Sequence, residues 1–463
     1  MPAGLRPKKP AKTRTLTLLS KAEFAGWLKK APAVRRRFVE QSGFAAAPGE
    51  VVLLPGGDGA VVGALAGIRG TFGSDDMWTI AGLPSRLPLG VYALDVEPAA
   101  AAATAAAIGW GLGSYAFTRY RKAGRRPAEL VLPKAADRAK VERSLAGAAL
   151  VRDLVNTPAE DMGPGELADA AAALAKRHGM SLRVVEGDEL LAQNYPLIHA
   201  VGRASSRAPR LIDLGWGDPS HPRVTLVGKG VCFDTGGLDL KNDAGMKLMK
   251  KDMGGAAHVL GLAEMIARAK LKVRLRVLVA AVDNAVSGNA FRPLDVIRSR
   301  KGITVEIGNT DAEGRLILAD AIADAVAEKP DLLIDMATLT GAARVALGPE
   351  LPPMYANRDE TAAALVRHAA AEADPLWHMP LWAGYRSQLD SKVADMNNIS
   401  GGAFAGSVTA ALFLQEFAGR DTDWVHLDIY AWNPHGRPGR PEGAEAQCLR
   451  AVFALIAERA EGT

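Results

Sequence analysis

Cysteine is scarce in this sequence, because only Cys232 and Cys448 occur among 463 residues. Two distant cysteines exclude a disulfide framework and a cysteine-based zinc module, and they suit a reducing compartment. A long apolar run is also missing. The 21 charge-free residues 98–118 are mostly Ala, Gly, Ser and Thr, which predicts a buried Ala-rich helix and no membrane span. The apolar run after the basic start ends at Lys21, so no secretory signal is apparent and a cytoplasmic protein is expected.

The positive charge is concentrated at the start of the chain. Residues 1–50 hold 11 Lys/Arg and 3 Asp/Glu, a net of +8, whereas the whole chain has a net charge of +5, which leaves −3 for the remainder. The excess comes from a basic arm, residues 1–14, and from the run Arg35-Arg36-Arg37. Such a segment either contacts nucleic acid or another polyanion, or simply keeps the start of the chain soluble. The second interpretation is favoured, and nucleic-acid binding remains the alternative.

The length predicts more than one domain, because a single core rarely serves 463 residues. Residues 1–134 show a mixed pattern of strands and helices that predicts an N-terminal α/β domain without chemistry of its own. Residues 135–157 predict a long linking helix, which Pro158 ends. The remainder, residues 158–463, is the expected catalytic domain.

The larger part alternates between strand and helix patterns. Strands are predicted over residues 182–186, 210–214, 223–227, 273–282, 303–307, 332–336 and 424–429. Helices are predicted over residues 164–178, 254–269, 316–327 and 408–417. This alternation is typical of an α/β domain with a mainly parallel central sheet covered by helices on both faces. In such sheets, ligands bind beyond the carboxyl ends of the strands.

The stretch Asn309-Thr310-Asp311-Ala312-Glu313-Gly314-Arg315-Leu316 lies between a predicted strand and a predicted helix. In extended backbone, alternate residues share a face, so Asp311, Glu313 and Arg315 are expected to converge on one spot. Two carboxylates at one spot repel each other unless a cation or a proton separates them. The stretch by itself fits a metal site and a solvated ion pair equally well.

Other charged side chains follow predicted strand ends or begin a helix. They are Lys229 and Asp234 in a Gly-rich run after residue 227, then Lys241, and Asp252 at a helix start, where an N-cap is the simplest role. Together with Asp311 and Glu313 they put four carboxylates and two lysines in one expected cleft. A pair of divalent ions about 3.5–4 Å apart would stabilise that charge. Oxygen ligands suit Mg²⁺ or Mn²⁺, and Zn²⁺ also accepts them.

None of the eight histidines falls in these motifs. His258 lies within a predicted helix and His426 within a predicted strand, and structural roles are expected for both.

Several stretches resemble the leucyl aminopeptidase family, cytosolic two-metal exopeptidases. The stretches are Val227-Gly228-Lys229-Gly230-Val231, Phe233-Asp234-Thr235-Gly236-Gly237, Asp252-Met253-Gly254-Gly255-Ala256-Ala257 and the octapeptide that begins at Asn309. Asn156-Thr157-Pro158, Ala337-Thr338-Leu339-Thr340-Gly341-Ala342, Ala394-Asp395-Met396-Asn397-Asn398 and His426-Leu427-Asp428-Ile429 support the likeness. It covers roughly residues 150–430 and is weak over the N-terminal domain.

The resemblance implies a metal-dependent aminopeptidase that releases N-terminal residues from peptides. One metal site would use Asp234, Asp311 and Glu313, and a tighter site would use Lys229, Asp234, Asp252 and Glu313. The ions would be Mn²⁺ or Zn²⁺. Lys241 would polarise the scissile carbonyl, and Arg315 would hold a bicarbonate that accepts a proton from the bridging water.

The resemblance also implies a substrate pocket and an assembly. Met249, Thr338 and Gly341 would line an apolar pocket for the first side chain, with leucine as the expected preference, and the subunits would form a homohexamer.

The sequence departs from the family pattern near the expected site. Asp239 and Asn242-Asp243 add polarity beside Lys241, and Tyr430-Ala431-Trp432-Asn433 stands where small residues are expected. Both departures bear on substrate preference. A two-metal phosphatase or nuclease is the competing enzyme class, but that chemistry gives no reason for Lys229 as a ligand.

Overall fold

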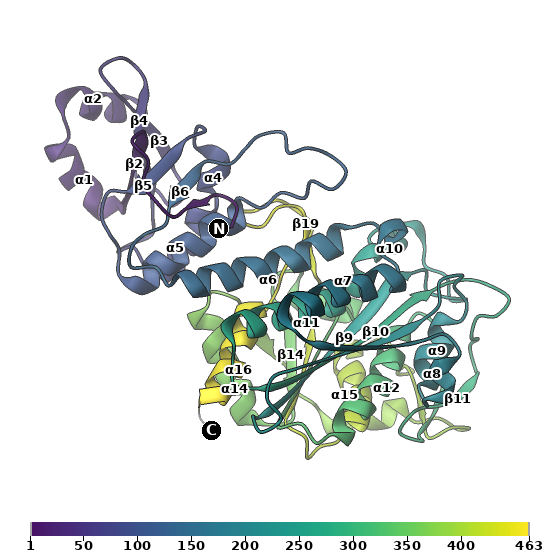
Figure 1. Cartoon of the computed structure of the whole chain (residues 1–463). Coiled ribbons are helices and arrows are strands. Elements are labelled where there is room, and N and C mark those ends of the chain that lie inside the picture. Colours follow the sequence, from purple (N-terminus) through teal and green to yellow (C-terminus); the bar gives the residue numbers. More distant parts are fainter. Residues whose placement is uncertain (1, 462–463) are drawn as a thin grey trace. The chain divides into compact units, whose positions relative to one another are not determined.

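The structure is a computed structural model that describes residues 2–461 (Figure 1). The chain forms two compact units. The first holds the residues up to Ala149 together with His435–Glu442, and the second holds Leu150–Pro434 and the chain from Gly443 onward. The division falls inside helix α6, Arg138–Asn156, which begins three residues after the start of the predicted linking helix.

The first unit is built on a six-stranded sheet with the order β1-β6-β5-β2-β4-β3. All neighbouring strands are parallel except β3 and β4. The strands are β1 Leu5–Arg6, β2 Thr13–Leu19, β3 Val51–Pro55, β4 Val61–Gly67, β5 Val91–Leu94 and β6 Glu129–Val131.

Helices pack against this sheet and against each other. They are α1 Lys21–Lys30, α2 Ala33–Gln41, α3 Met77–Ala81, α4 Leu83–Arg86 and α5 Ala100–Gly113, with a short 3-10 turn, η1 Ser74–Asp76, before α3. A capping box starts α1, in which the Ser20 side chain accepts from Glu23 N and the Glu23 side chain accepts from Ser20 N. The predicted Ala-rich helix is present as α5 and is buried, but it ends at Gly113, where glycines weaken its last turn.

The second unit is built on an eight-stranded sheet with the order β15-β14-β17-β13-β9-β10-β8-β7. Its centre, from β17 through β13 and β9 to β10, is parallel. Antiparallel pairs join β10 to β8, β8 to β7, and β17 to β14. The strands are β7 Ser181–Glu186, β8 Arg210–Trp216, β9 Arg223–Asp234, β10 Arg274–Asn284, β13 Leu332–Ala337, β14 Pro353–Ala356, β15 Trp377–His378 and β17 Trp424–Asp428. The prediction of a mainly parallel sheet is confirmed.

Strand β9 corrects a sequence prediction. It continues to Asp234, seven residues beyond the predicted end, so Lys229 lies inside a strand and Asp234 is its last residue. Gly228 and Gly230 made the strand seem to end early. At Gly228 a Cβ would lie 2.7 Å from the Cα of Ala256. The glycine is therefore needed for the close approach of the following helix, and the strand passes through it.

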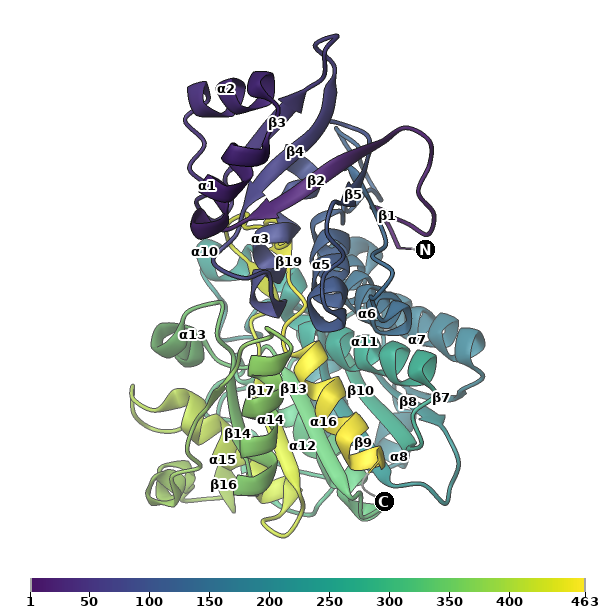
Figure 2. The ribbon, with the colours of Figure 1, turned by 90° about the vertical axis from the view of Figure 1, so that its left-hand side faces the viewer.

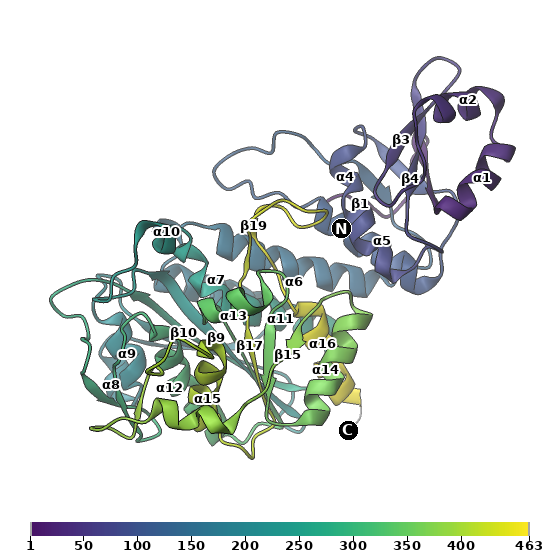
Figure 3. The ribbon, with the colours of Figure 1, turned by 180° about the vertical axis from the view of Figure 1, so that it is seen from behind.

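Helices cover both faces of this sheet (Figures 2 and 3). Helices α7 Pro164–His178, α11 Gly254–Ala269, α14 Asp359–Ala371 and α16 Leu449–Glu461 pack together on one face, and α9 Pro196–Gly202, α12 Glu313–Ala327 and α15 Gly406–Ala418 lie on the other. Shorter helices are α8 Glu189–Ala192, α10 Asp243–Met246 and α13 Gly341–Leu347, with 3-10 turns η2 Ala159–Asp161, η3 Met249–Met253 and η4 Ala383–Leu389.

Two small sheets complete the second unit. One has the order β11-β12-β16 and contains Val296–Arg298, Thr304–Glu306 and Met396–Asn397. The other pairs β18, Trp432–Asn433, with β19, Gly443–Ala444. Within residues 2–461, no helix combines the length and apolar character that crossing a membrane would require.

Candidate metal centre

Three buried carboxylates meet where strand β9 ends. Asp234 is the last residue of β9, Asp252 lies in η3 before α11, and Glu313 is the first residue of α12. Each offers an oxygen within 4.8 Å of the other two. Their exposed fractions are 2%, 3% and 1%. Three carboxylates that are this close together and shielded from solvent need compensating positive charge.

Lys229 supplies part of that charge. From inside β9, its Nζ lies 2.7 Å from Asp252 Oδ2 and 2.9 Å from Glu313 Oε1, and it donates to the carbonyl oxygen of Thr338 at 2.9 Å. Gly314 leaves room for the lysine, because a Cβ there would lie 2.6 Å from Lys229 Cε. The ammonium therefore sits between two of the three carboxylates.

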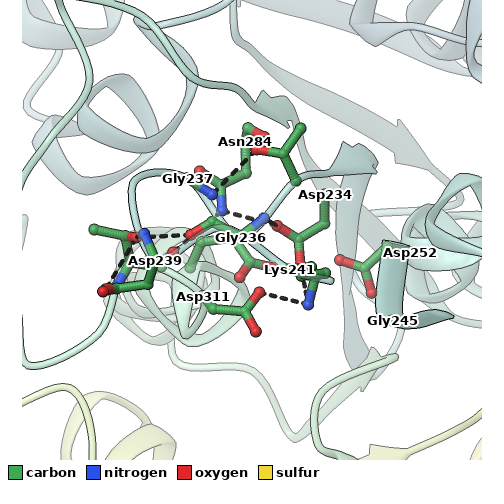
Figure 4. Close-up of polar contacts among 12 residues, drawn as sticks. Asp234, Gly236, Gly237, Asp239, Lys241, Gly245, Asp252, Asn284 and Asp311 are labelled. Carbon is green, nitrogen blue, oxygen red and sulfur yellow. Dashed lines mark hydrogen bonds and ion pairs between the residues drawn. The ribbon is translucent and has the colours of Figure 1, made fainter. Parts of the chain in front are cut away.

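Lys241 supplies the second positive charge (Figure 4). Its Nζ lies 3.0 Å from Asp234 Oδ2 and forms an ion pair with Asp311 Oδ1. Asp311 is about one-third exposed and does not belong to the group of three carboxylates. The centre thus has two lysine ammonium groups, each paired with a different set of carboxylates.

The prediction that the octapeptide is extended as far as Arg315 is wrong. Helix α12 begins at Glu313, three residues before the predicted start, so the backbone from Glu313 to Arg315 is helical. Residues two apart on a helix do not share a face. Asp311 consequently pairs with Lys241 and Glu313 with Lys229, while Arg315 Nη1 donates to Asn398 O at 2.7 Å.

The pKa values follow from burial and crowding. Burial and then repulsion by Asp252 raise the pKa of Asp234 to about 6. Burial and then repulsion by Asp234 raise the pKa of Glu313 well above its usual value. For Lys229, burial alone would lower the pKa, but attraction to Asp252 and Glu313 outweighs it and raises the pKa. For Asp252, burial alone would raise the pKa, but attraction to Lys229 and Lys251 outweighs it and lowers the pKa. The bare protein therefore favours the protonated forms of Glu313 and Lys229 and the ionised form of Asp252.

Asn284, which the sequence analysis missed, orients Asp234. Its Nδ2 donates to Asp234 Oδ1 at 2.8 Å and to Thr310 O at 3.1 Å, and Gly236 N also donates to Asp234 Oδ1, at 2.8 Å (Figure 4). One oxygen of Asp234 is thus held by the protein, and the other faces Lys241. The signal in the sequence was the polar pair Asp283-Asn284, which ends strand β10 after the apolar run of residues 277–282.

Replacing Asn284 with alanine is expected to weaken binding of divalent cations about 10- to 100-fold, because its amide holds the Asp234 carboxylate in place. Competition with a fluorescent chelator would measure this affinity. Asn289→Ala is the matched control, since Asn289 is exposed in the loop that follows β10. An unchanged affinity in Asn284→Ala would contradict the positioning role.

Asp239, a departure from the family pattern, is hydrogen-bonded to the start of the octapeptide. Its Oδ2 accepts from Thr310 N at 2.7 Å and from Thr310 Oγ1 at 3.2 Å, and Asp239 N donates to Thr310 Oγ1 at 2.9 Å. Asn242 accepts from Gly245 N at 2.8 Å and caps α10. The additional polarity beside Lys241 is therefore used within the protein.

Asp252 is not a helix N-cap, which corrects the simplest prediction for it. Met253 occupies the N-cap of α11, and Asp252 Oδ1 accepts from Thr338 Oγ1 at 2.8 Å. The loop that carries Thr338 is held by Asp428, whose carboxylate accepts from Leu339 N at 3.1 Å and from Thr340 Oγ1 at 2.6 Å. Asp428 belonged to a supporting motif, but the sequence assigned it no role.

The three predicted pocket residues differ in burial. Met249 begins η3 and is half-buried, Thr338 is buried, and Gly341 is exposed at the start of α13. A Cβ at Gly341 would have open space around it. Nearby, Lys251 Nζ lies 4.8 Å from the centroid of the Tyr430 ring, and the Arg344 guanidinium lies 5.7 Å from the same ring. The aromatic departure is therefore flanked by two cations.

Arg315 and the two histidines are buried. Burial lowers the pKa of Arg315 to about 10, and within the described residues its Nε has no hydrogen-bond partner. His258 Nδ1 lies 2.6 Å from Gly254 O, and its Nε2 accepts from Gln447 N. His426 Nδ1 lies 2.6 Å from Asp335 Oδ1. These contacts give both histidines structural partners.

The donor set fits divalent cations. Across residues 2–461, the buried oxygens Asp252 Oδ2, Glu313 Oε1 and Asp311 Oδ1 each have a lysine ammonium as their one polar partner. Carboxylate oxygens with one amine nitrogen form a set that Mn²⁺ and Zn²⁺ accept. Such ions would neutralise the crowded carboxylates more fully than two lysines do.

Comparison with known families covers most of the chain. A sequence model of the cytosol aminopeptidase family, catalytic domain, matches residues 149–453. A model of the M17 aminopeptidase N-terminal domain matches residues 15–133.

Individual relatives agree with these matches. Peptidase B of Serratia proteamaculans is 42% identical over 365 residues, which cover 76% of this chain and 85% of the relative. Peptidase B of Yersinia pestis is 45% identical over 70% of this chain and 78% of its own length.

Solved structures show the same fold. The crystal structure of a cytosol aminopeptidase from Coxiella burnetii is 47% identical, with a TM-score of 0.94 over 98% of this chain and 99% of that one. The bottromycin maturation enzyme BotP in complex with Mn is 33% identical, with a TM-score of 0.87 over 97% of this chain and 100% of that one.

Proposed function

Since the chain belongs to the cytosol aminopeptidase family and is a metal-dependent aminopeptidase, we propose that two divalent ions bind at the carboxylates around the end of β9. The observation that carries this proposal is the convergence of Asp234, Asp252 and Glu313 within 4.8 Å. Two lysines at the same centre support it, because they offset part of the negative charge of the bare carboxylates.

We assign the ligands to two positions that share Asp234 and Glu313. The first position uses Lys229 and Asp252 as well, and the second uses Asp311 through its carboxylate and its backbone carbonyl. Lys229 would hold the ion as the neutral amine, which requires the loss of its ammonium proton to solvent. Its pairing with Asp252 and Glu313 supports this assignment, since an ion would replace the proton between the same groups.

The ions would supply Lewis acidity, which polarises the scissile carbonyl and lowers the pKa of water. Lys241 keeps its proton and donates to the carbonyl oxygen of the substrate as negative charge develops there. Its raised pKa supports that role, because attraction to Asp234 and Asp311 outweighs burial. Arg315 would hold a bicarbonate ion through its unpartnered Nε. Asn284 keeps Asp234 oriented throughout.

We propose that Met249, Thr338 and Gly341 line the pocket for the first side chain of the peptide. Met249 and the methyl group of Thr338 favour an apolar residue such as leucine. Lys251 and Arg344 beside Tyr430 would instead attract an acidic side chain if they face the same pocket. A substrate panel separates the two preferences.

Treatment with a chelator is expected to abolish hydrolysis of leucyl-anilide, and Mn²⁺ or Zn²⁺ is expected to restore it. The panel would contain leucyl-, alanyl-, glutamyl- and lysyl-anilides, assayed with defined metal loading, and N-acetyl-leucyl-anilide and a phosphoester as negative controls. Release of the anilide from leucine in preference to glutamate supports an apolar pocket. Full activity in the chelated protein, or hydrolysis of the acetylated substrate, would contradict the proposal.

Further proposals concern metal identity, assembly and location. Manganese is supported by the complex of BotP with Mn, and zinc by the donor set. We also propose a homohexamer in the cytoplasm, in which residues 158–463 carry catalysis, residues 1–134 form the N-terminal domain and residues 135–157 link them. The matched families and relatives are peptidases, which gives no support to nucleic-acid binding through residues 1–14.

A further inference from the structure

The first unit contains a cavity that the aminopeptidase function does not use. Its volume is about 490 Å³, within the usual range of small-molecule pockets. It lies between the sheet and the connection from α1 to α2, and its polar lining comes from Thr15, Thr17, Lys30, Arg35 and Asp95. Strands β2 and β5 run parallel here, and Asp95 directly follows β5. Ligands of α/β sheets commonly bind at such strand ends.

The sheet face beneath the helices changes character at the cavity. Alternate residues of β2 share a face, so Thr15, Thr17 and Leu19 point the same way. Leu19 joins the buried core under α1 and α2, whereas the two threonines line the cavity. Gly63 pairs with Thr15 in the neighbouring strand and adds no side chain to the floor. Hydroxyl groups thus stand where the packed core would otherwise continue.

Charges of both signs line the cavity without pairing across it. Lys30 ends α1 and Arg35 lies in the first turn of α2. Within residues 2–461, neither side chain has an ion pair or a side-chain hydrogen bond. Asp95 Oδ2 accepts from Thr17 Oγ1 at 2.7 Å and has no cationic partner. Lys30 and Asp95 are exposed at the mouth of the cavity and Arg35 is half-buried. A ligand with both a negative and a positive group could pair with all three side chains.

An apolar wall completes the cavity. The Trp27 ring is half-buried, packs against the core under α1 and also lines the cavity with Leu54 and Val62. Indole presents a flat surface to an apolar or aromatic group. A plain inorganic anion would leave this wall and Asp95 unused, and Asp95 would repel it.

We propose that this cavity binds a free amino acid as its zwitterion. Lys30 and Arg35 hold the carboxylate, and Asp95 with the Thr17 hydroxyl holds the ammonium group. The side chain of the ligand lies against Trp27. Free amino acids are the products of an aminopeptidase, so the N-terminal unit would sense what the catalytic unit releases. The binding site itself does not depend on the proposed arrangement of metals.

Calorimetric titration of the metal-loaded, full-length enzyme with L-leucine tests this. Wild type is expected to bind leucine at a second class of site in each subunit, in addition to the active site. In Arg35→Gln and in Asp95→Asn, the affinity of this second site should fall about tenfold or more. Two analogues separate the charges: 4-methylpentanoate lacks the ammonium group and isopentylamine lacks the carboxylate. Both are expected to bind this site at least about tenfold more weakly than leucine.

Exposed neighbours provide matched controls. Arg36→Gln lies on the same helix as Arg35, and Asp75→Asn removes an exposed carboxylate; neither residue lines the cavity. Both controls should bind leucine as wild type does, and all four variants should keep the wild-type kcat/KM and melting temperature. Absence of the additional class of site would overturn the proposal. Equal binding of 4-methylpentanoate or of inorganic phosphate would overturn it as well, because either result would indicate a simple anion site.

Discussion

Glu313→Gln is expected to lower kcat/KM roughly a thousandfold or more while the fold stays intact. Glu313 is shared by both proposed metal positions, and its exposed fraction is 1%. A neutral amide of the same size removes the charge that holds a divalent ion but keeps the packing at the start of α12. The loss should therefore appear in metal affinity and in catalysis together.

The same substitution is expected to stabilise the metal-free protein. The pKa of folded Glu313 is raised above its usual value by burial and by Asp234. A raised folded pKa means that the contribution of Glu313 to stability is present at low pH and is lost as the pH rises through that value. Glutamine does not titrate and has no such loss. The increase in the free energy of unfolding of Glu313→Gln over wild type should therefore be largest near neutral pH and should shrink in acid.

Assays of anilide hydrolysis with increasing Mn²⁺, together with urea unfolding of the chelated protein, would measure both effects. Glu360→Gln, which removes an exposed carboxylate from the first turn of another helix, α14, is the matched control and should change neither. Wild-type activity in Glu313→Gln would exclude Glu313 as a shared ligand. Lost activity with lost stability would point instead to a defect in folding.

Lys229→Met is expected to destabilise the metal-free protein by about 3–5 kcal/mol near neutral pH. Among the described residues, the Lys229 ammonium is the one cation that forms ion pairs with both Asp252 and Glu313. Methionine has a similar length and no charge, so two buried carboxylates would be left without compensation. They would protonate or repel each other, and both outcomes cost free energy.

Metal should reverse most of this loss, because a divalent ion supplies the missing charge. Unfolding of Lys229→Met in urea with chelator and with saturating Mn²⁺ would test the reversal. Weaker metal affinity than wild type would indicate that the lysine is itself a ligand. Unchanged affinity would indicate that it only compensates the negative charge when no metal is bound. Lys247→Met is the control, because Lys247 is an exposed lysine between Lys241 and Asp252 in the sequence. Equal stability of Lys229→Met and wild type without metal would refute the charge argument.

Regular elements with strong periodicity were predictable. Helices α7 and α11 have the predicted bounds because each combines an amphipathic or apolar pattern with a clear start. Strand β9 was predicted too short because two glycines have low strand propensity, and the packing of α11 decided the outcome. The start of helix α12 was predicted three residues too late. Acidic residues in a first turn resemble a loop in sequence, although they suit a helix N-terminus.

The sequence by itself determined which groups form the centre, because the spacing of Lys229, Asp234, Lys241, Asp252, Asp311 and Glu313 resembles one family closely. It also determined the alternation of strands and helices that brings strand ends together. Only the tertiary structure decided how the charges pair. Lys229 joins Asp252 and Glu313, whereas Lys241 joins Asp234 and Asp311.

Only the tertiary structure also identified Asn284 and Asp428 as the residues that orient this centre. The physical reason is distance along the chain. Periodicity and propensity report interactions between residues a few positions apart, and these contacts join residues 50 to 89 positions apart. Which donor meets which acceptor across such separations depends on the packing of the helices against β9.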